Sequence, residues 1–122
     1  MIKAKSITPV LRILDIEKAR EFYLDFLEFN LDWEHRYEED YPLYMQVSAG
    51  SCQLHLSEHY GDSNPGIKIR IQVEDIKELH QRISSKKYKY ARPGLESAHG
   101  HLEIRIGDPF GNSICFYEPQ QS

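Results

Sequence analysis

The feature that most constrains this sequence of 122 residues is an internal repeat, in which one pattern returns sixty residues later. The aligned pairs are Leu11 with Ile71, Ile13 with Val73, Asp15 with Asp75, Ile16 with Ile76 and His55 with Cys115. A helix-covered sheet of half this length cannot bury its apolar face alone. The two repeated units must therefore pair, either within one chain or with a second copy.

Each unit follows the order strand, helix, then three strands. Residues 7–13 alternate between apolar and polar, which predicts a half-buried strand. Asp15 then offers a helix N-cap, and apolar residues recur at helical spacing over 16–27. Further strands of the first unit are predicted at about 29–37, 43–48 and 51–57.

The second unit repeats this order after a turn-rich linker at 59–66. A strand is predicted at 67–73, and Asp75 can cap a helix that begins at 76. Three more strands are predicted at about 88–91, 101–106 and 112–118. We therefore predict an α+β fold in a single domain over 1–122, made of tandem βαβββ modules at about 6–58 and 66–118 whose curved mixed sheets form a cleft.

The charge balance argues against nucleic acid as a partner. The formal net charge is −4, whereas binding to a phosphate backbone needs a clustered basic surface. The only basic run is KKYKYARP at 86–93. Its cations are interleaved with tyrosines, on which the bases of a single-stranded nucleic acid could stack. A strand edge protected by lysines is the simpler interpretation, and we favour it.

Hydropathy indicates no membrane segment, because no run approaches the roughly 20 apolar residues that a span needs. The first ten residues lack the apolar stretch of a secretory signal, so we expect a cytoplasmic protein. Cys52 and Cys115 are far apart in the sequence, and we expect two free thiols.

The polar sides of the strands are the expected site, since their apolar sides face the helices. Residues placed on this cleft wall are Thr8, His55, Lys68, Arg70, Arg105 and Cys115. His55 has two interpretations, a ligand contact or a hydrogen-bonded structural residue. Cys115 is either an inert buried side chain or half of a Cys–His pair.

The cations on these faces also leave two interpretations open. Lys68, Arg70 and Arg105 either form a solvated surface or favour a carboxylate or phosphate in a closed groove. Glu103 could pair with either arginine and reduce that field. The run HLSEHYGD at 55–62 has zinc-like spacing, but it leaves a strand instead of lying on a helix, so we do not expect a metal there.

Aromatic residues concentrate in LDWEHRY at 31–37, which contains Trp33, the only tryptophan. His35 and Tyr37 fall on the same strand face as Trp33. Together with Tyr44 on the next strand, Trp33 and His35 are predicted to contact a flat heteroaromatic ligand by stacking. A dimer interface or the edge of the core would present the same pattern.

Three segments resemble the vicinal-oxygen-chelate superfamily, which includes glyoxalase I, extradiol dioxygenases, fosfomycin-resistance enzymes and bleomycin-resistance proteins. They are VLRILDIEKAREFYLDFLEF at 10–29, QLHLSE at 53–58 and DPFGNSICFYE at 108–118. The resemblance covers nearly the whole chain, with its motifs in the family's order. It implies the paired βαβββ fold that the repeat predicts.

The resemblance also implies where a metal would bind, since metal-dependent members carry ligands on the first and last strands of each module. Those four places hold Thr8, His55, Lys68 and Cys115. Only His55 is an ordinary ligand there, and a catalytic zinc needs three. We therefore expect no metal and no cofactor.

This pattern is similar to that of bleomycin-resistance proteins, which bind a drug without transforming it. We expect a homodimer that sequesters a glycopeptide-type antibiotic such as a bleomycin in a metal-free cleft, with no catalytic residues. One alternative is a metal-dependent lyase, isomerase or dioxygenase of the same superfamily. Another is a binding protein for a different metabolite or a regulatory partner.

Overall fold

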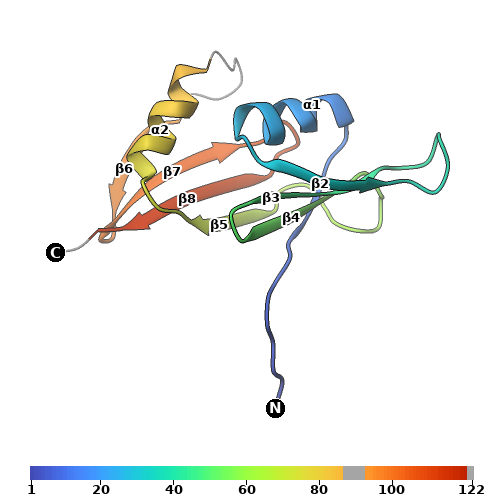
Figure 1. Cartoon of the computed structure of the whole chain (residues 1–122), viewed down its shortest axis with the longest axis horizontal. Helices are drawn as coiled ribbons and strands as arrows, with labels where there is room; N and C mark the ends of the chain where they lie inside the picture. Colours follow the sequence, from blue (N-terminus) through green and yellow to red (C-terminus); the bar gives the residue numbers. More distant parts are fainter. Residues whose placement is uncertain (87–92, 121–122) are drawn as a thin grey trace.

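The fold consists of two four-stranded mixed sheets and two helical segments (Figure 1). A computed structural model describes residues 1–86 and 93–120. The first unit contains β1 (Val10–Arg12), α1 (Ile16–Arg20), η1 (Glu21–Phe26), β2 (Asn30–His35), β3 (Tyr44–Ala49) and β4 (Cys52–Ser57). The second unit contains β5 (Lys68–Gln72), α2 (Ile76–Ser85), β6 (Leu95–Ala98), β7 (His101–Gly107) and β8 (Ser113–Pro119).

The strand pairing repeats with the same offset as the sequence. The sheet orders are β1-β4-β3-β2 and β5-β8-β7-β6, so each unit places its first strand parallel to its last. Val10 lies opposite His55 in the first sheet, and Arg70 lies opposite Cys115 in the second. Both members of the pair shift by sixty residues, which confirms the α+β class and the paired βαβββ units.

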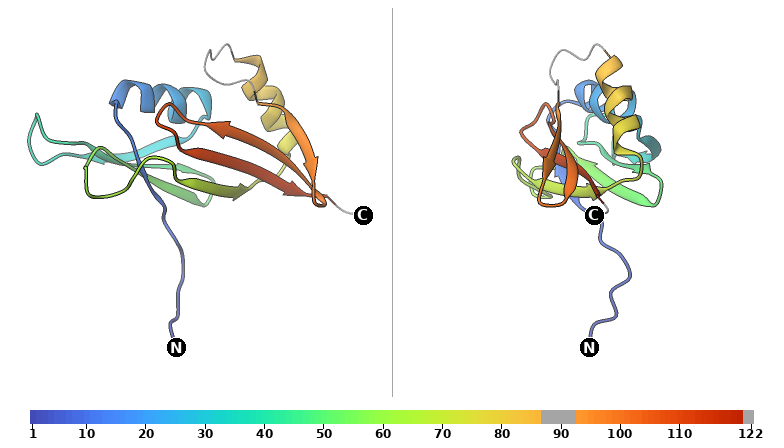
Figure 2. Two further views of the ribbon diagram at one scale, coloured as in Figure 1. Left: turned by 180° about the vertical axis from the view of Figure 1, so that it is seen from behind. Right: turned by 90° about the vertical axis from the view of Figure 1, so that its left-hand side faces the viewer.

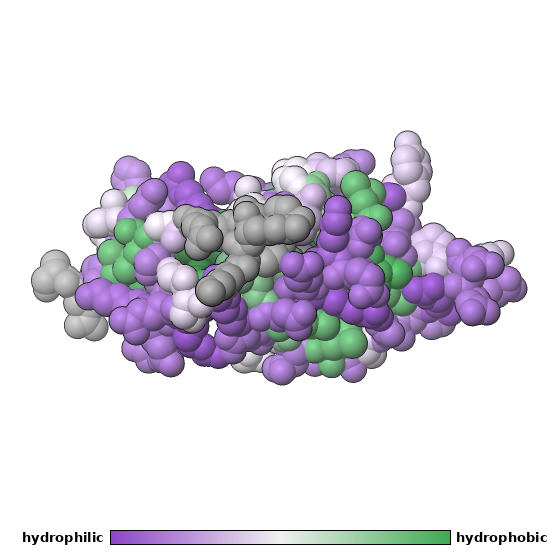
Figure 3. All heavy atoms as spheres, turned by 90° about the horizontal axis from the view of Figure 1, so that it is seen from above, coloured by the Kyte–Doolittle hydropathy of each residue, from purple (hydrophilic) through white to green (hydrophobic). Residues whose placement is uncertain are grey.

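Both helical segments lie on the same side of the two sheets (Figures 1 and 2). The buried residues form one cluster that includes both units, with Leu11, Phe22 and Val47 from the first and Ile76, Ile104 and Ile114 from the second. Seen from the helix side, the surface is mostly hydrophilic with separate hydrophobic areas (Figure 3). Pairing within the chain therefore buries the helix-facing sides of both sheets.

The two helices begin by different means. The Asp15 carboxylate accepts a hydrogen bond from the Lys18 amide, which confirms the predicted cap. Asp75 has a left-handed backbone and makes no side-chain cap bond, so the expected cap is wrong. Glu118 replaces it, because its carboxylate accepts hydrogen bonds from the amides of Asp75 and Ile76.

Two other predictions about the strands need correction. The first strand begins at Val10 instead of residue 7; residues 1–8 are exposed, and the N-terminal segment runs away from the sheets (Figure 1). Pro9 has no amide hydrogen to continue the strand ladder, although its carbonyl accepts a hydrogen bond from the backbone amide of His55. The strand predicted at 88–91 lies outside the described residues, and β6 was not predicted because its sequence, LESA, has low strand propensity.

A polar network in the β7–β8 turn joins the two units. Asp108 accepts a hydrogen bond from the Tyr23 hydroxyl at 2.6 Å. The fully buried Asn112 side chain donates to the Arg12 carbonyl and to the Asp108 carboxylate, both at 2.9 Å. The amides of Phe110 and Asn112 also donate to Asp108. The turn residues of DPFGN therefore fix the contact between the units as well as the reversal of the chain.

Candidate functional site

Three rings meet on the first sheet, on the face away from the helices. The rings of Trp33 and Tyr44 stack 6.0 Å apart at an angle of 11°. His55 contacts both rings edge-on, at 5.3 Å from Trp33 and 5.1 Å from Tyr44. Trp33 is 42% exposed on an edge strand. We call Trp33, Tyr44 and His55 the aromatic cluster, and it offers an accessible surface for stacking.

A chain of hydrogen bonds holds this cluster in place. The Tyr44 hydroxyl lies 2.7 Å from His55 Nδ1, and His55 Nε2 lies 2.9 Å from Gln46 Oε1. The Gln46 amide then donates to Asp32, which also accepts from Ser48. A bulge between Leu31 and Trp33 brings Asp32 onto this face. Since the Gln46 oxygen faces His55, Nε2 donates to Gln46 and Nδ1 accepts from Tyr44.

Burial favours the neutral forms of the cluster's titratable groups. It lowers the pKa of His55 and raises the pKa of Tyr44, whose hydroxyl is also affected by the negative charge of Asp62. A neutral imidazole and a phenol present no charge to a ligand. The cluster is therefore suited to contact and hydrogen bonding.

The second sheet presents a charged group centred on Glu103, on the corresponding face. This carboxylate is only 3% exposed and pairs with Arg70, Arg105 and His101. The hydrogen bond from His101 is the main cause that lowers the pKa of Glu103 to about 2, and the two arginines add to it. Arg70 also lies 4.6 Å over the Tyr117 ring. We call these five residues the Glu103 group.

The structure bears on both interpretations of the cations. Glu103 pairs with both arginines at once, so it offsets part of their charge. The arginine side chains remain 43% and 62% exposed, and Lys68 is exposed at the start of the same face. A ligand's acidic group could therefore reach guanidinium groups that Glu103 already orients.

Cys115 lies beneath the Glu103 group, and His35 lies opposite Tyr44 in the register of β2 and β3. Cys115 is 1% exposed, and Arg70 Nη1 lies 3.5 Å from its sulfur. Burial raises the pKa of this thiol, which disfavours the reactive thiolate. His35 is exposed and contacts the Tyr37 ring at 5.3 Å. The predicted roles of both residues as ligand contacts stay predictions.

Sequence reasoning did not identify four residues that shape these faces. They are Asp32, Gln46, His101 and Tyr117. Strict alternation predicts Asp32 on the face opposite Trp33, because alternation does not reveal a bulge. Alternation places Gln46 on the polar face of its own strand, and does the same for His101 and Tyr117. The strand register then brings Gln46 next to His55 in the first sheet, and His101 and Tyr117 next to Glu103 in the second.

The four family positions for metal ligands do not fit a divalent ion. Thr8 is exposed and precedes β1, and both ring nitrogens of His55 are hydrogen-bonded. Lys68 carries a cation, and the raised pKa of Cys115 opposes the thiolate that a metal would need. Within residues 1–86 and 93–120, no three His, Cys, Asp or Glu side chains are arranged to hold a metal ion.

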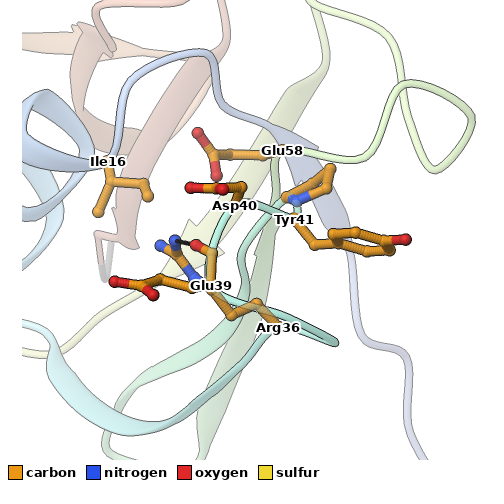
Figure 4. A pocket seen from close by; sticks show the side chains of 7 residues that line it. Ile16, Arg36, Glu39, Asp40, Tyr41 and Glu58 are labelled. Carbon is orange, nitrogen blue, oxygen red and sulfur yellow. Dashed lines mark hydrogen bonds between the residues drawn. The ribbon is translucent and has the colours of Figure 1, made fainter.

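A separate polar pocket of about 440 Å³ lies beside the β2–β3 loop (Figure 4). Arg36, Glu39, Asp40, Tyr41 and Glu58 contribute to its lining. Arg36 donates to the Glu39 carbonyl, and the Glu58 carboxylate accepts from the Leu43 amide. These contacts give Arg36 and Glu58 structural roles in the loop.

A family model described as glyoxalase superfamily protein matches residues 1–122. The chain belongs to the glyoxalase superfamily. A comparison with curated proteins found no match. Among residues 1–86 and 93–120, no helix is long and apolar enough to span a membrane.

Solved structures share this fold over the full length. A protein of Bacillus anthracis assigned to the glyoxalase family has 19% identity and a TM-score of 0.72, covering 98% of this chain and 99% of its own. An antibiotic binding protein from Streptomyces sp. CB03234 has 17% identity and a TM-score of 0.71, covering 98% and 100%. A bleomycin-binding protein from Streptomyces verticillus, complexed with copper(II)-bleomycin, has 25% identity and a TM-score of 0.66, covering 100% of both chains.

Proposed function

We propose that this protein binds a small molecule with a flat aromatic part, as bleomycin-resistance proteins do, and leaves its bonds unchanged. The observation that supports this most is the aromatic cluster, with a partly exposed Trp33 above neutral Tyr44 and His55. Planar heteroaromatic groups stack well on such rings. The similarity to bleomycin-binding and antibiotic-binding structures makes a glycopeptide-type antibiotic the first ligand to test.

A second copy of the chain would complete the site in this proposal. No helix of the described residues covers the other side of the two sheets (Figure 2), and a partner there would form the opposite wall of a cleft. Residues 1–9 also carry exposed apolar side chains at Met1, Ile2 and Ile7. Burial of such side chains between two copies would favour a homodimer. Light scattering should then give twice the chain mass of 14.3 kDa.

The binding test follows Trp33 fluorescence while bleomycin is added to the protein in buffer with a chelator. We expect a saturable change, because Trp33 is the only tryptophan and lies in the cluster. Tyr44→Ala should weaken binding about tenfold, since loss of a stacking ring costs roughly 1–1.5 kcal/mol. Tyr41→Ala is the matched control, because Tyr41 is exposed and belongs to the β2–β3 loop.

Two results would count against this function. One is an unchanged fluorescence signal up to millimolar bleomycin. The other is equal binding by wild type and Tyr44→Ala, provided that both have the same circular dichroism spectrum. The latter would place the ligand away from the cluster.

A further inference from the structure

A second cavity system lies between the two units, away from the aromatic cluster. Two adjoining cavities of about 190 Å³ and 460 Å³ share four lining residues, Phe29, Ala49, Val73 and Phe116. We call the two together the interunit crevice. The turn between β3 and β4 forms part of its wall and lies beside the end of β5 (Figures 1 and 2).

The lining of the interunit crevice is mainly apolar. Phe29 and Phe116 are at most 5% exposed and belong to the common core, while Ala49 and Val73 pack against that core and remain half-buried. An apolar cavity of about 150 Å³ is enough to hold benzene in an engineered protein. The smaller cavity alone therefore has room for a small ring or a short branched chain.

Arg82 and Glu28 are the charged residues that line the smaller cavity, and Lys86, which lies outside this lining, is a second partner of Glu28. Arg82 pairs with Glu28, and the same carboxylate pairs with Lys86 at 2.6 Å. The hydrogen bond from Lys86 is the main cause that lowers the pKa of Glu28. Lys86 also donates to the carbonyls of Asp25 and Phe26, so its position is fixed. Arg82 is half exposed and is the cation that a further anion can reach.

We infer that the interunit crevice binds a small apolar acid, with its hydrocarbon body in the cavities and its anionic group at Arg82. Glu74 lines the larger cavity with no Lys or Arg among the described residues of the same lining, whereas the carboxylate at the other end, Glu28, is paired with Arg82 and Lys86, so the acidic group is favoured at Arg82. Cys52 also lines that cavity, and burial raises the pKa of its thiol. The thiol therefore adds to the apolar wall without contributing charge.

The test compares two fluorescent probes on the full chain. They are 8-anilinonaphthalene-1-sulfonate, an apolar anion, and N-phenyl-1-naphthylamine, a neutral molecule with a similar body. We expect saturable binding of both, with Arg82→Gln weakening the anion about fivefold and the neutral probe less than about twofold. Gln81→Ala, on the same helix and exposed, should change neither affinity.

Ala49→Trp should reduce the affinity for both probes at least about tenfold, since an indole on the shared wall fills the space. The naphthalene body of each probe can also stack on the aromatic cluster, so the binding step assigned to the interunit crevice is the one that is lost in Ala49→Trp and kept in Trp33→Phe. Nuclear magnetic resonance of wild type provides a test that needs no substitution. The anion should shift the amide signals of Gly50 and Glu74.

Several outcomes would overturn the inference. They are a lack of saturable binding at millimolar probe, wild-type affinity in a folded Ala49→Trp variant, and amide shifts confined to other parts of the chain. If the affinity for the probes falls as the protein concentration rises, a second copy of the chain covers the interunit crevice, and this result would also overturn the inference. Equal loss of both probes in Arg82→Gln would overturn the assignment of the anionic group.

Discussion

The carboxylate of Glu103 organises the polar face of the second sheet. It is almost fully buried and accepts hydrogen bonds from His101, Arg70 and Arg105. The cost of burying one negative charge is offset by these three partners. Without the carboxylate, two guanidinium groups and an imidazole would have no negative charge between them.

A pH series tests this role. The pKa of Glu103 is about 2 in the folded protein, against an ordinary value of 4.5. A lowered pKa contributes stability above the ordinary value, and this contribution is lost as the pH falls from about 4.5 through 2. We expect Glu103→Gln to lower the free energy of unfolding at pH 7 and to reduce its decline with acid. Urea unfolding at several pH values provides the measurement.

Glu96→Gln is the matched control, because Glu96 lies opposite Glu103 in the β6–β7 pairing and is exposed. It should change the free energy of unfolding by less than about 0.5 kcal/mol. If Glu103→Gln keeps the acid dependence of wild type, the carboxylate does not contribute as we describe.

At the scale of helices and strands, the start of α2 depends on a residue 42 positions further along the sequence from Ile76. Glu118 on β8 accepts hydrogen bonds from the first amides of the helix. We expect Glu118→Ala to destabilise the protein by about 1 kcal/mol, the usual cost of a lost cap. Thermal unfolding followed by circular dichroism measures this change.

Asp75→Gly provides the comparison, since it removes the Asp75 side chain, which makes no cap bond, and glycine tolerates the φ of 53°. Its midpoint should stay near that of wild type. A larger loss in Asp75→Gly than in Glu118→Ala would show that Asp75 is the effective cap.

Most helices and strands could be predicted, because alternation and N-caps depend on residues that are close together in the sequence. The alternation in 101–106 and 112–118 predicted β7 and β8, and Asp15 predicted the start of α1. The Glu118 cap could not be predicted, because it needs the register between distant elements. β6 was missed since four residues with weak strand propensity carry almost no pattern.

For the candidate site, the sequence could predict faces but not contacts. Alternation placed His55 on a polar face and left open which face of the strand with Trp33 lines the cleft, and the register of β2, β3 and β4 brings the two rings together. The offset of sixty residues aligned His55 with Cys115, yet their surroundings differ. His55 lies among rings, whereas Cys115 lies beneath Arg70. The surroundings of His55 and Cys115 differ because the neighbouring strands carry different side chains. The alignment of the two repeated units compares single positions and therefore does not show these neighbours.

At the scale of the whole molecule, a small polar network holds the two units together. Asn112 bonds to the Arg12 carbonyl in the first unit and to Asp108 and the Ile67 amide in the second. Asn112→Ala should lower the free energy of unfolding by about 3 kcal/mol, because it leaves buried groups without partners. Urea unfolding tests this value.

Asn64→Ala is the control for the asparagine side chain itself, since Asn64 is exposed in the linker between the units. We expect a change within about 0.5 kcal/mol. A similar effect of the two substitutions would mean that the network adds little to the contact between the units.

We propose that the protein holds its ligand by contact alone, because the donors at the family's metal positions do not suit a divalent ion. Elemental analysis of protein purified without chelators is the decisive experiment. We predict no stoichiometric metal, either in wild type or in His55→Ala. Stoichiometric zinc, iron, nickel or manganese in wild type, lost in His55→Ala, would contradict the claim and favour a metal-dependent enzyme.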